Sequence, residues 1–172
     1  MVKSEIIEKA KEFCEEHNIN SYPVKIVDLC SKYGISVFEE YLPDDVSGII
    51  AVRDEIFDDF NTNRLIVVNL SDSARRRRFT IAHELAHYML HRNGSQIYAH
   101  RDAGQNGGIE NEANVFASNI LMPEHLVRSA LSHLEDESWG FIPSSVKAEY
   151  IADEFAVSVS AAQVRLEQLG IS

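Results

Sequence analysis

Several features that mark specialised classes of protein are scarce in this chain. The 172 residues include only two cysteines, Cys14 and Cys30, which lack the spacing of a zinc-binding pair and fall among the apolar positions of helical patterns. We therefore expect reduced thiols in a core, which fits a cytoplasmic protein. No apolar run reaches the length of a membrane span, and residues 1–5 do not begin a secretory leader. Neither a membrane protein nor a secreted protein is predicted.

Positive charge is scarce as well. The chain has 16 lysine and arginine residues against 27 aspartate and glutamate residues, which gives a net charge of −11. Because proteins bind the nucleic-acid backbone mainly through lysine and arginine, this balance argues against a direct nucleic-acid partner. The exception is a run of four arginines at 75–78. It is either the solvated first part of a helix or a basic patch able to recruit an acidic partner.

The rest of the composition is that of an ordinary globular protein. Apolar residues make up 45% of the chain and charged residues 25%, and this length is sufficient to bury a core without disulfide or metal staples. No internal repeat or low-complexity segment is present. We expect residues 1–172 to form a single domain, with C-terminal helices at about 144–170 packed on it.

The period of the apolar residues changes along the chain. Residues 35–41, 46–52 and 64–70 read as strands and predict a small three-stranded antiparallel sheet. Helical periods and breakers predict the remaining elements, which are helices at about 4–18, 24–33, 71–91, 109–121 and 124–134 and a glycine-rich loop at 92–108. The expected fold class is therefore α+β, with the sheet packed against a mainly helical body.

A His-Glu-x-x-His motif occupies residues 83–87 of the long central helix. Residues four apart on a helix lie about 40° apart around its axis, so His83 and His87 can both direct an imidazole nitrogen at one metal ion. Glu84 can then act as the general base toward the water that a metal activates. The helix around the motif is largely apolar, which places these polar groups near a core, where they need partners. A metal supplies such a partner.

A catalytic zinc site keeps three protein ligands and one open position, so a third ligand is required. The candidates are Glu110, Glu112, His91 and His100. Glu110 precedes the apolar positions of its helix by nearly whole turns, whereas Glu112 lies about 200° round the axis and is expected to face solvent. His91 drifts about 80° from the direction of the first ligand. We therefore expect Glu110 to complete the site, with Asn114 one turn later holding a histidine.

Five segments follow one another in a specific order. They read RFTIAHELAHY at 78–88, ExxANxFA at 110–117, LMP at 121–123, FAVS at 155–158 and RLxxLG at 165–170. In this combination, which spans roughly residues 20–170, the chain resembles the ImmA/IrrE family of metallopeptidases. One departure is Ala86, where many members carry glycine. Alanine is the better helix former and should leave the ligands undisturbed.

The resemblance implies a zincin-like fold of the gluzincin type. It implies a zinc ion (Zn²⁺) held by His83, His87 and Glu110, with Glu84 as the general base. It also implies a protein substrate, namely a helix-turn-helix repressor of a prophage, a mobile element or a stress regulon, which the enzyme cleaves so that repression ends.

Two other functions compete with a zinc-dependent endopeptidase. The first is a DNA-binding regulator, because residues 151–166 resemble a helix-turn-helix, although Arg165 is the one basic residue of its second helix. The second is an interaction protein that retains the metal and binds a repressor or a toxin–antitoxin partner without cutting it. Cleavage by the wild type, but not by a Glu84 variant, distinguishes the enzyme from this binder.

The sequence does not determine two parts of a peptidase site, the oxyanion donor and the strand that binds the substrate. Tyr88, His91, His100 and Arg101 are all available to stabilise an oxyanion, and the pattern does not select among them. A substrate peptide would add to an exposed sheet edge, for which the strand at 46–52 is the candidate.

Overall fold

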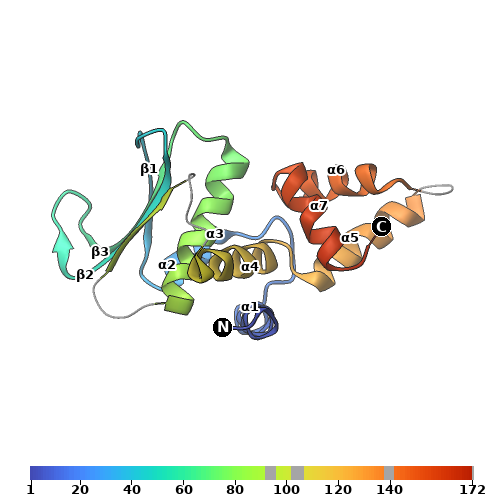
Figure 1. Ribbon diagram of the computed structural model, residues 1–172, viewed down its shortest axis with the longest axis horizontal. Helices are drawn as coiled ribbons and strands as arrows, with labels where there is room; N and C mark the ends of the chain where they lie inside the picture. The colour runs from blue at the N-terminus through green and yellow to red at the C-terminus, as the bar shows by residue number, and fades with distance from the viewer. Residues whose placement is uncertain (92–95, 102–106, 138–141, 172) are drawn as a thin grey trace.

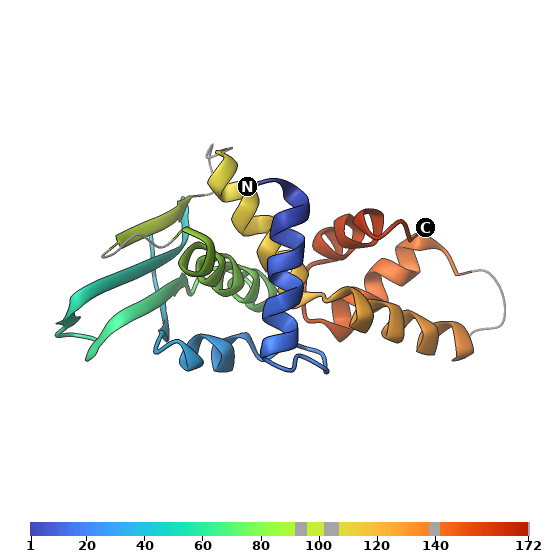
Figure 2. The same ribbon diagram turned by 90° about the horizontal axis from the view of Figure 1, so that it is seen from below.

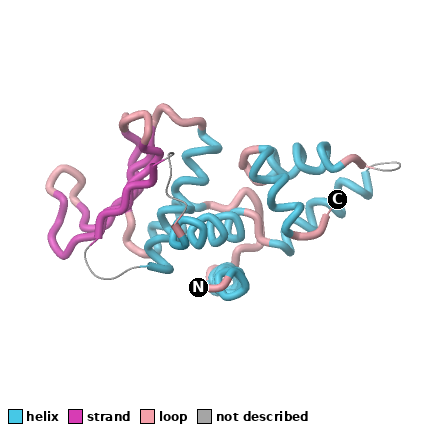
Figure 3. The backbone as a smooth tube through the Cα atoms, in the orientation of Figure 1, coloured by secondary structure: helices cyan, strands magenta, loops and turns pink. Residues whose placement is uncertain are grey.

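The computed structural model describes residues 1–91, 96–101, 107–137 and 142–171. In chain order its elements are α1 (Lys3–Glu16), α2 (Ile26–Lys32), β1 (Ser36–Glu40), β2 (Val46–Phe57), β3 (Thr62–Asn69), α3 (Ala74–His91), β4 (Gln96–Arg101), α4 (Gly108–Leu121), α5 (Glu124–Glu137), α6 (Ser144–Glu154) and α7 (Val159–Gln168). The sheet forms one end of the molecule and α5, α6 and α7 form the other, with α1, α3 and α4 between them (Figure 1). Strands and helices are segregated along the long axis (Figure 3). The predicted α+β class is confirmed.

The sheet differs from the predicted three antiparallel strands in two respects. It has four strands in the order β1-β3-β2-β4, and β1 runs parallel to β3, so the sheet is mixed. The parallel pair arises because the chain crosses from β1 to β2 and returns along β3, which places β3 between them. The additional strand, β4, lies within the segment predicted as the loop 92–108. The glycines at 94 and 104 flank it and obscure its short alternating pattern.

The strand at 46–52, predicted to be the substrate edge, is an inner strand. In β2, Ile50 is paired with Ile66 of β3 on one side and with Tyr98 of β4 on the other. Both pairings are antiparallel, so the backbone groups of this stretch are already used within the sheet. The edges of the sheet are β1 and β4.

One buried apolar cluster runs the length of the molecule. It includes Ile6 of α1, Ile66 of β3, Leu85 of α3, Phe116 of α4 and Phe155 at the end of α6. The helix α1 packs across α4 in the middle of this cluster (Figure 2). At the far end, the ring of Tyr22 stacks on that of Phe155 with 4.6 Å between the ring centroids. The C-terminal helices therefore share apolar contacts with the segment between α1 and α2.

Both cysteines lie in this cluster. Cys14 and Cys30 are buried, and neither forms a disulfide. Burial raises the pKa of each thiol to about 12, so both are protonated at neutral pH. This geometry agrees with the expectation of core thiols.

The four arginines at 75–78 form hydrogen bonds that connect α3 to other segments of the chain. Arg75 donates to Asp153 at 2.6 Å and to the backbone oxygen of Val157 at 3.1 Å. Arg76 donates to Ser47 Oγ at 2.9 Å.

The other two arginines of the run act in the same way. Arg77 contacts Glu39 at 3.1 Å, and Arg78 donates to the backbone oxygen of Val24. The start of α3 is thus connected to the segment that precedes α2, to the sheet and to the C-terminal helices. Neither of the two sequence interpretations of this run, a solvated helix start or a patch that recruits a partner, describes this role.

No helix in the described part of the chain combines the length and the apolar character that a membrane crossing requires.

Replacing Phe155 by alanine tests whether the C-terminal helices and the rest of the chain unfold together. Phe155 is completely buried, so the change should lower the free energy of unfolding by about 3–5 kcal/mol. Urea denaturation followed by circular dichroism should show a single transition at a lower midpoint. As a matched control, Val164→Ala removes a side chain that is 50% exposed and should change stability by less than about 0.5 kcal/mol. Two separate transitions, of which only one moves, would contradict a single cooperative domain.

Candidate metal centre

The helix α3 is enclosed on all sides in its central part. Every residue from Thr80 to Tyr88 is buried, because the sheet covers one side of the helix and α4 crosses the other (Figure 1). The motif residues are among the most enclosed, with exposed fractions of 0% for His83, 0% for Glu84 and 2% for His87. The expectation that these polar groups lie in a core is thus met by the geometry.

A glycine of the sheet allows this close packing. A Cβ atom on Gly48 of β2 would lie 2.3 Å from Cγ2 of Thr80 and 3.4 Å from Oε1 of Glu84. Any larger residue would push α3 off the strand. Sequence analysis did not select Gly48, although a glycine inside a strand often marks a close approach of another segment.

Three side chains from two helices converge beside α3. Nε2 of His83 lies 3.0 Å from Nε2 of His87 and 3.1 Å from Oε2 of Glu110. Nε2 of His87 lies 3.4 Å from Oε1 of Glu110. The structure therefore brings together the three residues that the sequence analysis selected, with the carboxylate supplied by the first turn of α4.

These separations are those of a tetrahedral metal site. Two ligand atoms, each about 2.1 Å from one zinc ion, lie about 3.4 Å apart at the tetrahedral angle. The three observed separations fall at or slightly below that value. Two imidazoles and a carboxylate are also a donor set suited to zinc. The residues could accordingly hold a metal ion with small adjustments of their side chains.

Neighbouring groups leave the two imidazoles ready to act as ligands. Oδ1 of Asn114 accepts a hydrogen bond from Nδ1 of His83 at 2.9 Å, which fixes the proton on Nδ1 and leaves the lone pair on Nε2. Burial and the proximity of His83 lower the pKa of His87 to about 4. His87 is thus neutral at pH 7, as a metal ligand must be.

Glu84 is a buried carboxyl group next to the converging ligands. Burial is the main cause that raises its pKa well above the ordinary value, and the charge of Glu110 adds to the shift, whereas the backbone of Ile50 opposes it. Within the described part of the chain, neither of its oxygens has a hydrogen bond of good geometry, and the backbone N–H of Ile50 is the donor that acts on the group. A fully buried carboxyl group in this state is costly and calls for an explanation outside packing.

Two of the other candidate ligands, His91 and Glu112, lie apart from this cluster. His91 is directed toward Glu112, with 3.5 Å between Nε2 and the nearer oxygen. Glu112 also accepts from the Met1 amino group and is 13% exposed, so the expectation that it faces solvent is wrong. The reason is that α1 packs on this side of α4. The side chains of His100 and Arg101 lie outside the described residues.

Tyr88, the remaining candidate for the oxyanion, is directed into the apolar core. Its ring lies edge-on to that of Tyr33, with 6.0 Å between centroids, and the guanidinium of Arg64 lies over it. These contacts are structural, and they do not single out Tyr88 as an oxyanion donor.

Two comparisons with known proteins bear on this site. The family model Peptidase_M78, described as the IrrE N-terminal-like domain, matches residues 30–167. The chain is also similar to the metallopeptidase ImmA of Bacillus subtilis (strain 168), with 23% identity over 106 residues. That similarity covers 57% of this chain and 56% of the relative, so it spans little more than half of either protein.

Replacing Gly48 by alanine tests the close contact between β2 and α3. The added methyl group cannot fit beside Thr80, and the forced movement should lower the free energy of unfolding by about 1–3 kcal/mol. Thermal unfolding measures the change. Gly108→Ala is the matched control, because a Cβ there meets nothing within 4 Å and alanine favours the helix. Equal stability of the two variants would show that α3 does not press on the strand at Gly48.

Proposed function

Because the chain belongs to the peptidase family M78 of IrrE N-terminal-like domains, we propose that it is a zinc-dependent endopeptidase. The metal ligands are His83, His87 and Glu110, and Glu84 is the general base. One observation carries this proposal. Two imidazole nitrogens and a carboxylate converge within 4.8 Å of one another, beside a buried glutamate that lacks a hydrogen-bond partner in the described part of the chain.

Each side chain of the site has a separate role in the proposed peptide hydrolysis. A bound zinc ion would supply Lewis acidity toward the scissile carbonyl and toward water. Glu84 takes the proton from the attacking water and passes it to the leaving amine. Because burial raises the pKa of Glu84, its carboxylate is a stronger base than an exposed one. Asn114 positions His83 through the 2.9 Å hydrogen bond.

The substrate that we propose is a helix-turn-helix repressor of a prophage, a mobile element or a stress regulon, cleaved in the cytoplasm. Family membership supports this substrate class, and the acidic balance of the chain agrees with a protein partner in place of DNA.

The alternative of a DNA-binding regulator is disfavoured by the position of one residue. Arg165 is the basic residue that α7 would need for reading a groove, but it is 3% exposed, and its Nε donates to the backbone oxygen of Met122 at 3.0 Å. In this position it cannot enter a DNA groove to contact base edges, which direct readout requires. A nanomolar, operator-specific gel shift at physiological salt would reverse this judgement.

Replacing Glu84 by glutamine separates a peptidase from a protein that only binds its partner. The change removes the general base, so cleavage of the repressor encoded beside the gene should slow by about 10²- to 10⁴-fold, while the metal content stays unchanged. Gel electrophoresis of timed incubations measures the cleavage. Glu112→Gln is a matched control that should cut normally, and a chelator should stop the wild type. A stable complex with no cleavage by the wild type would favour the non-cleaving binder.

Metal content tests the ligand set without reference to activity. Glu110→Ala removes a ligand and should empty the site at a zinc concentration that saturates the wild type. Asn114→Ala removes the partner of His83 and should weaken metal affinity by about 10- to 100-fold. Competition with a chromogenic chelator measures both. Glu112→Ala should bind as the wild type does, and full zinc occupancy in the Glu110 variant would refute the third ligand.

A further inference from the structure

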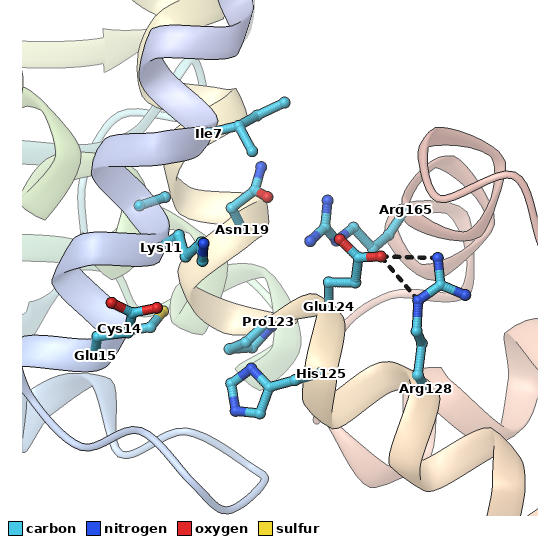
Figure 4. A pocket seen from close by; sticks show the side chains of 11 residues that line it. Ile7, Lys11, Cys14, Glu15, Asn119, Pro123, Glu124, His125, Arg128 and Arg165 are labelled. Carbon is cyan, nitrogen blue, oxygen red and sulfur yellow. Dashed lines mark hydrogen bonds and ion pairs between the residues drawn. The ribbon is translucent and has the colours of Figure 1, made fainter.

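A pocket of about 570 Å³ lies where the C-terminal helices meet α1 and α4 (Figure 4). Its walls come from α1, from the C-terminal end of α4 at Asn119, and from α5 and α7. None of its lining residues belongs to the metal centre. Its volume falls within the range of sites that hold small molecules.

Arg165 directs two hydrogen-bonding nitrogens into this pocket. The residue is only 3% exposed. Of its three side-chain nitrogens, Nε alone donates a hydrogen bond, to the backbone oxygen of Met122. Within the described part of the chain, the other two guanidinium nitrogens have no hydrogen-bond partner, and Figure 4 shows the group facing the pocket. Both nitrogens are open to the interior of the pocket, and the charge of Glu124 acts on the group. An anion in the pocket would accept hydrogen bonds from both nitrogens.

The acidic residue drawn nearest to Arg165 is hydrogen-bonded to another arginine. The carboxylate of Glu124 is held by Arg128, one turn along α5, at 2.7 and 2.8 Å (Figure 4). Lys11 adds a further positive charge, and Glu15 a negative one. The pocket thus carries three cations against two carboxylates in a chain whose net charge is −11.

Two more features define what fits the pocket. The helix α5 begins there, at Pro123 and Glu124, and the N-terminal end of a helix carries a partial positive charge. Ile7 and Ala10 of α1 provide an apolar wall on the opposite side. The ligand should therefore combine an anionic group with a short apolar body.

We propose that this pocket binds a small organic anion, a carboxylate or a phosphate with a short apolar body, through the two free nitrogens of Arg165. Such a ligand would contact α1 and α4 on one side and α5 and α7 on the other. It would therefore fasten the C-terminal helices to the rest of the molecule. This binding site is independent of peptide hydrolysis at the metal centre.

Titration of the full-length chain with simple anions tests the proposal. The probes are hexanoate, acetate and inorganic phosphate, each compared with sodium chloride at matched ionic strength. Hexanoate should bind saturably and more tightly than acetate, because its tail reaches the apolar wall. At about 100 times its dissociation constant it should raise the melting temperature by roughly 5–10 °C. Saturable binding of phosphate alone would assign the anionic group to a phosphate.

Variants and spectra locate the binding. Arg165→Met should weaken binding by about tenfold or more, since hydrogen bonds to a charged group are lost. Arg53→Met, on the distant β2–β3 hairpin, should bind as the wild type does. In the wild-type amide spectrum, Ala10 and Asn119 should shift on addition of hexanoate, which keeps the test valid even if Arg165→Met does not fold. No saturable binding of any probe, unchanged binding by a folded Arg165→Met, or shifts confined to the surroundings of His83 and His87, would overturn the proposal.

Discussion

The close packing of α3 on β2 is the contact on which the rest of the site depends. At Gly48 the strand has no side chain, and the helix approaches until Thr80 and Glu84 reach the space that a Cβ would fill. This contact buries one side of the helix, and α4 buries the other. Three polar motif residues are thus held in an apolar surrounding, where their positions are fixed and their charges are weakly screened. This burial also leaves the carboxyl group of Glu84 without a hydrogen bond of good geometry in the described part of the chain.

The candidate metal centre is assembled from segments distant in sequence. His83 and His87 owe their alignment to helical spacing alone, but the position of Glu110 depends on how α4 crosses α3. That crossing is supported by α1, which packs across α4 and brings Phe13 edge-on to Phe116 with 5.6 Å between ring centroids. Side-chain packing outside the site therefore determines whether the third group lies within reach.

The predictable features were those with a period or a fixed spacing. The motif helix, the convergence of Glu110 with the two histidines and the hydrogen bond from His83 to Asn114 follow from angles around a helix, which a sequence displays directly. The strand β4 was not predicted, because the glycines on both sides of it obscure its short alternating pattern. The parallel pairing of β1 with β3 depends on the path of the connecting chain, and the contacts of Glu112 depend on where α1 packs. Gly48 could have been noticed as a glycine within a strand, but its neighbour Thr80 could not be identified before the fold was known.

The arginines at 75–78 have a further consequence for how the molecule meets others. The guanidinium groups of Arg75, Arg76 and Arg77 form ion pairs with Asp153, Asp72 and Glu39, so most of the positive charge of the densest basic stretch is offset within the chain. The long-range field of the protein is then dominated by its excess of 11 negative charges. Such a field repels nucleic acid and accelerates diffusional encounter with basic surfaces, an effect that weakens as ionic strength rises. A partner with a basic surface would thus be drawn toward the molecule by its negative charge.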